Sequence, residues 1–152
     1  MSVSMDSVMT CWKKAFEIET FMQFKKVDAF GLHGLAPERI DNRSWYLKVP
    51  LGYELMLRPG DRAIIPLGLK FNFANDFVGM VTHISEMFVE IGVRVDNFHL
   101  QGMTDNVNLV VRNVGSVNFK IMGGEDIAIL YLLKLQYDYV GCLEVVKFGC
   151  EE

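Results

Sequence analysis

The amino-acid sequence predicts an all-β fold, a jelly roll, sandwich or barrel of short strands. From Arg43 onward, runs of Val, Ile, Leu, Phe and Tyr are broken by turn residues about every 8–12 positions. The length of 152 residues fits one domain with one core. A chain that is 51% hydrophobic and 22% charged is typical of a packed globule. We expect a β domain over 20–152 and an N-terminal helical extension over 1–19.

Residues 6–19 predict the helix of this extension. Asp6 or Ser7 can cap it, and apolar side chains follow at spacings of three and four, at Val8, Cys11, Trp12, Ala15 and Phe16. One short amphipathic helix is not stable alone in water. It must therefore dock on the body of the protein, on a neighbouring subunit or on a partner. The apolar run from Thr20 to Val27 then predicts the first strand.

Residues 28–43 are rich in Gly, Pro, Asp and Asn and predict a long loop. Loops of this length are uncommon in compact domains and are often functional. The segment could be an insertion, a binding loop or a contact with another protein, and the sequence does not choose between these.

Charge and cysteine usage exclude several classes of protein. The net charge of −4 provides no global field for nucleic acid. No apolar run is long enough to cross a bilayer, and residues 1–10 lack the pattern of a secretory signal. The three cysteines are odd in number and none are at CxxC spacing, so neither a disulfide framework nor a zinc site is predicted. We expect an intracellular protein, in the cytoplasm or nucleus, without membrane or nucleic-acid partners.

Four phrases between residues 44 and 135 resemble the dUTPase (deoxyuridine triphosphate nucleotidohydrolase) family. The segment 65–69 reads IPLGL where the family carries "IPTGL", and 77–81 reads FVGMV where it carries a "GYYG.V" hairpin. The segments 110–121 and 124–130 are similar to its "L.N.G...F.I" and "GDRIAQL" phrases. Each phrase alone also suits any antiparallel sheet, because Pro and Gly supply turns. Their common order and spacing carry the resemblance.

The resemblance implies where catalytic groups should lie. In the family, an aspartate in a hairpin written "GVIDxDYRG" positions the attacking water, and a tyrosine stacks under the deoxyribose. The resemblance places the matching hairpin over 96–106 of this sequence. On that register Leu100 takes the place of the aspartate, Met103 that of the tyrosine and Thr104 that of an arginine. Leucine can neither accept a proton nor orient a water molecule. The register itself depends on counting back from Asn113, and a slip could bring another carboxylate into play.

The remaining motifs depart from the family in the same direction. In the "PRSG" motif Ser85 is kept, but Ile84 stands for the arginine and Glu86 for the glycine. Asp126 and Ile129 replace an arginine and a glutamine in the fourth motif, and residues 146–152 do not resemble the Gly-rich arm. We therefore predict no catalytic residue and no metal ligand. The resemblance assigns a vestigial pocket to five residues, Ser85, Phe98, His99, Leu100 and Met103.

These departures predict a catalytically inactive dUTPase-like protein that serves as a structural or interaction module. The resemblance implies a homotrimer of the family's type, with the strand-like segment 139–148 exchanged between subunits, and it is compatible with a viral source. The helix over 6–19 or the segment 28–43 would contact another protein. In a trimer, His83 or His99 could bind a metal on the threefold axis, although a surface histidine is the commoner case. The alternative is a divergent dUTP or pyrimidine nucleotide diphosphatase or nucleotide-binding protein, which alone would need Mg²⁺.

Overall fold

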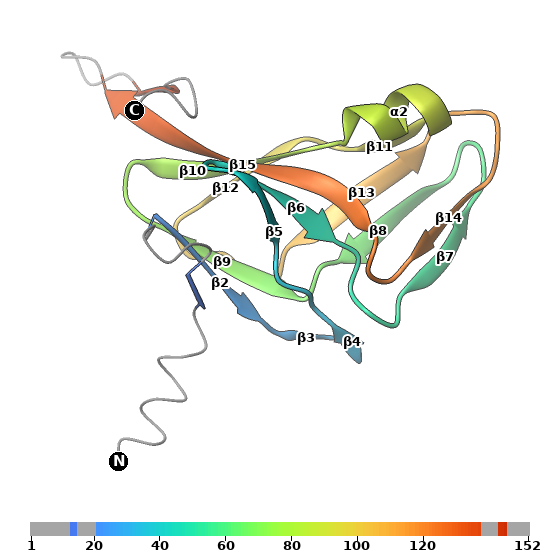
Figure 1. Cartoon of the computed structure of the whole chain (residues 1–152), viewed down its shortest axis with the longest axis horizontal. Helices are drawn as coiled ribbons and strands as arrows, with labels where there is room; N and C mark the ends of the chain where they lie inside the picture. The colour runs from blue at the N-terminus through green and yellow to red at the C-terminus, as the bar shows by residue number, and fades with distance from the viewer. Residues whose placement is uncertain (1–12, 15–20, 138–142, 146–152) are drawn as a thin grey trace.

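Antiparallel strands wrap around one main hydrophobic core in the computed structural model of the chain (Figure 1). The structure describes residues 13–14, 21–137 and 143–145. Strands dominate these residues, and a single short helix interrupts them. The prediction of an all-β fold is confirmed. Within the described residues, no helix has the length and apolar character that crossing a membrane requires.

The largest sheet is organised around β15, the longest strand of the fold. Its order is β12-β10-β15-β6-β5, and β16 pairs with the far part of β15. The strands are β5 (Glu38–Asp41), β6 (Ser44–Lys48), β10 (Phe77–Thr82), β12 (Phe98–Gln101), β15 (Asp126–Tyr137) and β16 (Leu143–Val145).

Smaller sheets complete the layers around the core. One has the order β1-β2-β9, another β11-β13-β8, and two pairs are β14-β7 and β3-β4. The strands are β1 (Lys13–Lys14), β2 (Met22–Lys26), β3 (Asp28–Ala29), β4 (Leu32–His33), β7 (Glu54–Leu57), β8 (Arg62–Pro66), β9 (Leu69–Phe73), β11 (Val93–Val95), β13 (Asn108–Asn113) and β14 (Phe119–Met122). The helix α2 (Ser85–Ile91) follows β10 and packs beside β11.

Alternating side chains from most strands meet in the core. On β9 and β13 the inward positions are buried and the outward ones are exposed or half-buried, the pattern of a sheet with one covered face. The strand β10 is buried on both faces for most of its length. Gly79 is required in its middle, because a Cβ there would lie 2.6 Å from the ring of Phe73 and 2.8 Å from Leu130.

The segment 28–43 contains one hairpin and the first strand of a second, so the prediction of a long loop is wrong. β3 and β4 are joined by Phe30 and Gly31, whose φ angles of 57° and 81° are both positive, as a type I′ hairpin turn requires. β5 then pairs with β6. The Gly, Asp and Asn residues that indicated a loop instead supply tight turns between short strands.

The two ends of the chain test the predicted extension and the predicted strand exchange only in part. Lys13–Lys14 pair with β2 as a strand, so the helix predicted over 6–19 is wrong at these two residues, where the open edge of β2 offers backbone partners. The rest of 6–19 lies outside the described residues. Leu143–Val145 is a strand, as predicted for 139–148, and in this single chain it pairs with β15.

Candidate functional site

The strand β12, which carries three of the five predicted pocket residues, ends the largest sheet. It pairs with β10 from Val78↔Gln101 to Val81↔Phe98, and the described residues provide no strand on its other side. Its side chains alternate. Phe98 and Leu100 pack against the main core, while His99 and Gln101 are exposed. The outer edge of β12 therefore presents main-chain groups rather than reactive side chains.

After β12 the chain crosses to β9 instead of turning back on itself. Phe73 N donates to Gly102 O at 2.8 Å, and Val107 N donates to Leu69 O at 3.0 Å. Gly102 makes the change of direction with a φ of 62°. The segment 96–106 is therefore not a two-stranded hairpin, because β12 pairs with β10 while β13 pairs with β8 and β11. The prediction of such a hairpin is wrong.

Thr104 fastens this crossing segment to β9. Its backbone N donates to Phe71 O at 2.8 Å, and its hydroxyl accepts from Phe71 N at 2.9 Å. The same hydroxyl donates to Asp105 O at 2.8 Å. At the position where the resemblance puts a phosphate-binding arginine, the side chain satisfies the local backbone instead.

The structure gathers only part of the predicted pocket. Phe98, His99 and Leu100 are consecutive on β12, and Met103 follows at the turn onto β9 with 69% of its surface exposed. Ser85 is exposed at the start of α2, just beyond the end of β10 that pairs with Phe98. Ser85 and Met103 thus follow opposite ends of the β10–β12 pair.

The beginning of α2 is held by packing rather than by a polar cap. Ile84 is the N-cap residue, makes no side-chain cap hydrogen bond and is 8% exposed. Glu86 lies in the first turn, where a negative charge is favourable to the helix dipole. The helix ends at Gly92, with a φ of 88°. At the family's arginine and glycine positions, Ile84 and Glu86 therefore stabilise a helix and provide no cation for a phosphate.

Two polar atoms beside these elements lack partners. His83 Nδ1 and Asn106 Oδ1 are buried without a hydrogen bond to any described residue. The His83 ring lies against Phe88, with ring centroids 5.2 Å apart. Within the ranges that the structure covers, no three His, Cys, Asp or Glu side chains are grouped as metal ligands.

Asp126, the residue of the fourth motif, is engaged in an ion-pair cluster. Lys48 Nζ lies 2.8 Å from Asp126 Oδ1 and 2.7 Å from Glu38 Oε1. Hydrogen bonds to Asp126 and then Glu38 raise the pKa of Lys48 above its ordinary value. The cluster links β5, β6 and β15, so it stabilises the pairing of these three strands.

Sequence reasoning missed the partners of Thr104 and Lys48, and it missed a row of arginines on β8, β11 and β13. Thr104 bonds a residue 33 positions away, and Lys48 bonds one 78 positions away. No local pattern reports such pairings, since they depend on strand register.

Comparison with known proteins places this geometry in a structural class. No protein-family model and no curated protein sequence matches the chain. Among solved structures, a staphylococcal bacteriophage 80alpha dUTPase mutant with dUpNHpp has a TM-score of 0.68 at 14% identity, over 86% of this chain and 99% of that one. A dUTPase mutant from phage phi11 of S. aureus has a TM-score of 0.67 at 12% identity, over 86% and 97%. Native EIAV dUTPase has a TM-score of 0.59 at 22% identity, over 74% and 88%. The chain has the dUTPase fold.

Proposed function

We propose that this protein is a catalytically inactive dUTPase-like protein that acts as a structural or interaction module. The observation that carries the proposal is the use made of two positions. Leu100, at the register of the water-positioning aspartate, packs against the core, and Ile84, at the register of an arginine, is buried. Hydrolysis of a triphosphate needs a group to orient water and cations to hold the phosphates. Apolar side chains supply neither.

The proposal includes a homotrimer with exchanged C-terminal segments. Apolar side chains are open on the β7–β14 pair, with Met56 49% exposed and Met122 42% exposed. Exposed apolar side chains on sheet faces favour contact with further subunits. Exchange of segment 139–148 would cover strand edges that have no neighbour among the described residues.

Partner contact, location and source complete the proposal. Phe30, at the tip of the β3–β4 hairpin, is 92% exposed, which supports a protein contact through segment 28–43. An odd number of cysteines without CxxC spacing supports an intracellular setting, in the cytoplasm or nucleus of a cell. The phage origin of the similar dUTPases supports a viral source.

A second candidate function is pyrimidine nucleotide binding or a divergent diphosphatase activity. The observation in its favour is the outer edge of β12, which no strand among the described residues covers. Its main-chain groups can hydrogen bond a base whatever the side chains are. The segment that follows β12 from Gly102 onward is held against β9 by backbone hydrogen bonds. Hydrolysis would also require Mg²⁺ on the triphosphate.

Two measurements on the purified full chain separate these functions. Incubation with dUTP and magnesium, with pyrophosphate as the readout, is expected to give no turnover above buffer. Thermal unfolding with dUMP, dUTP and dCTP then tests binding. Turnover at the rate of an ordinary dUTPase run in parallel would refute the inactive protein. The absence of any shift with all three nucleotides would refute the nucleotide-binding alternative.

A further inference from the structure

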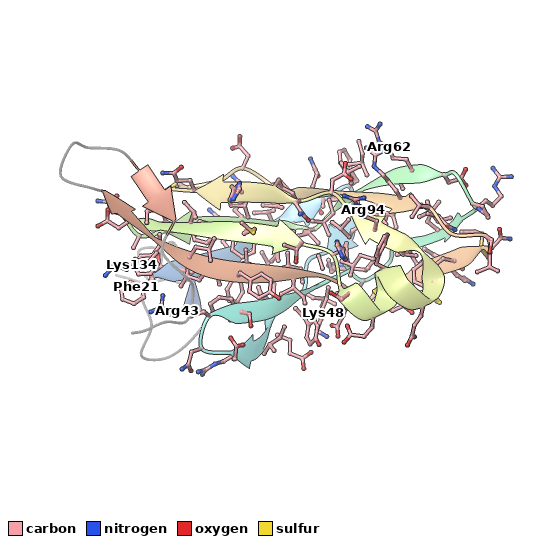
Figure 2. All side chains as sticks on the ribbon, turned by 90° about the horizontal axis from the view of Figure 1, so that it is seen from above. Phe21, Arg43, Lys48, Arg62, Arg94 and Lys134 are labelled. Atoms are coloured by element: carbon pink, nitrogen blue, oxygen red, sulfur yellow. The ribbon has the colours of Figure 1, made fainter. Side chains whose placement is uncertain are left out.

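Three arginines lie side by side across the sheet β11-β13-β8. Arg94 pairs with Arg112, and Arg112 pairs with Arg62, so the three Cα atoms form one row perpendicular to the strands. All three side chains are exposed, and their register puts them on one face of the sheet. In Figure 2 Arg62 extends from the upper edge of the molecule, and Arg94 lies nearer the middle of the view. Because neighbouring strands are about 4.8 Å apart, the row extends over roughly 10 Å.

Such a row is unfavourable by itself, since like charges directly opposite each other on a sheet repel. One carboxylate relieves it: Asp96 accepts hydrogen bonds from Arg112 Nε at 3.0 Å and Arg112 Nη2 at 3.1 Å. Among the described residues, neither Arg62 nor Arg94 has a direct ion-pair partner. The central guanidinium group, that of Arg112, is therefore ion-paired, and it has one guanidinium group without such a partner on each side.

All three arginines lower the pKa of Asp96. The hydrogen bond from Arg112 is the main cause that lowers the pKa of Asp96, and the charges of Arg94 and Arg62 add to it. One carboxylate thus lies in the field of three guanidinium groups. An additional anion would be attracted to the same face for the same reason.

A hollow opens beside the row. It has a volume of about 230 Å³ and is lined by Arg62 and Arg112 together with Gly60 and Gly115. Its floor is firmly held, because the buried Asn113 side chain donates to Leu57 O and to Val117 O, both at 2.8 Å, and accepts from Gly115 N at 3.0 Å. Preorganised surroundings of this kind lower the ordering cost of binding.

The strands favour a small phosphate chain over a nucleic acid. Single-stranded nucleic acids bind to basic grooves that also offer aromatic side chains for stacking. β8, β11 and β13 read RAIIP, VRV and NLVVRN and contain no aromatic residue. The net charge of −4 also opposes a long polyanion. A short linear anion needs only the row itself.

We propose that Arg62, Arg94 and Arg112 form a binding site for a linear polyphosphate group, with Asp96 positioning the central arginine. Arginine binds phosphate through paired N–H donors, and successive phosphates can engage successive guanidinium groups. The phosphate chain can be inorganic or the tail of a nucleotide, and its recognition does not depend on a base. This site lies on a different sheet from β12 and is independent of the proposed function.

Calorimetric titration of the full chain with inorganic tripolyphosphate at low ionic strength, without magnesium, tests the site. Binding should weaken about tenfold in Arg62→Gln and in Arg94→Gln, since each loses a hydrogen bond between charged groups. Arg39→Gln is the matched control, because it makes the same charge change on β5, outside the row. Thermal unfolding of each variant checks that the fold is kept.

Further arms separate the sources of the phosphate and the competing ligand. Orthophosphate should bind far more weakly than tripolyphosphate, because it can engage only part of the row. If Arg94→Gln weakens the binding of dUTP as much as that of tripolyphosphate, the row binds nucleotide tails. If dUTP binding is unchanged in Arg94→Gln, the row binds inorganic chains. Three results would overturn the proposal. Arg39→Gln could weaken tripolyphosphate binding as much as the variants in the row do, or orthophosphate could bind as tightly as tripolyphosphate. The third is a chain that binds a single-stranded oligonucleotide but not tripolyphosphate.

Discussion

At the residue scale, two single positions on the large sheet have a clear structural role. Gly79 lets β10 pass against Phe73 and Leu130, and Lys48 joins two carboxylates from β5 and β15. The first role depends on the missing Cβ of glycine, and the second depends on the charged amine of lysine. Each therefore gives a stability prediction that one substitution can test.

Gly79→Ala should destabilise the protein by about 1–3 kcal/mol, the cost of overpacking a filled core. The new Cβ would lie 2.6 Å from Phe73 Cζ and 2.8 Å from Leu130 Cδ1. Urea unfolding followed by fluorescence measures the change. Asn118→Ala, at an exposed loop position, should stay within about 0.5 kcal/mol of the parent. If both substitutions had the same small effect, β10 would not be packed as described.

Lys48→Met should lower stability at neutral pH by about 1 kcal/mol, because it separates Glu38 and Asp126 from their shared cation. The pKa of Lys48 is raised in the folded state, so its contribution is present below its ordinary value of 10.5 and is lost as the pH rises through the folded value.

The two proteins should therefore converge in stability in strongly alkaline solution, which urea midpoints at pH 7 and above pH 11 would reveal. Lys134→Met provides the control, because Lys134 is exposed on β15 without an ion pair among the described residues. A difference between Lys48→Met and the parent that did not change with pH would contradict the role given to the charge.

At the element scale, the sequence predicts turns and short strands but does not predict which strands pair. The rhythm of turns from Arg43 onward predicted short strands correctly, because turns depend on nearby residues. The path of β12 was not predicted, because nothing local says that it pairs with β10 rather than with β13. The row of Arg62, Arg94 and Arg112 was invisible for the same reason, since it exists only once the register of three strands is known.

Thr104→Val should destabilise the crossing segment by about 1–3 kcal/mol, because Phe71 N would lose its acceptor in a partly buried place. Valine keeps the shape and removes only the hydroxyl. Amide hydrogen exchange should show faster exchange at Phe71, together with a lower urea midpoint. Thr104→Ser keeps the hydroxyl and should restore most of the protection. Equal exchange in both variants would mean that the hydroxyl does not hold the segment.

At the scale of the whole molecule, the dUTPase fold is kept while the positions that resemble catalytic ones serve packing and pairing. Leu100 packs against the core, Thr104 hydrogen bonds the backbone of β9, and Asp126 forms an ion pair with Lys48. The sequence indicated the missing charges by residue type. It could not indicate what the replacements do, because their partners come from distant strands.

The proposed trimer gives a prediction for the assembled molecule. Sedimentation equilibrium at micromolar concentration should give three times the 17.3 kDa of the chain. Removal of residues 138–152 should lower the mass to that of smaller species if the segment is exchanged. A full chain that sediments as a monomer would refute the trimer, and a truncated chain that remains trimeric would refute the exchange.

The central position of β15 has a consequence for biosynthesis. β6 and β10 are made early in translation, yet both lie directly beside a strand that begins only at Asp126. Until the ribosome has released that late stretch, their backbone edges lack the neighbour that completes the sheet. Folding must therefore wait until most of the chain has emerged, and long-range pairing of this kind is intrinsically slow. Nascent chains stalled before Asp126 should consequently be the form most prone to aggregation and to capture by chaperones.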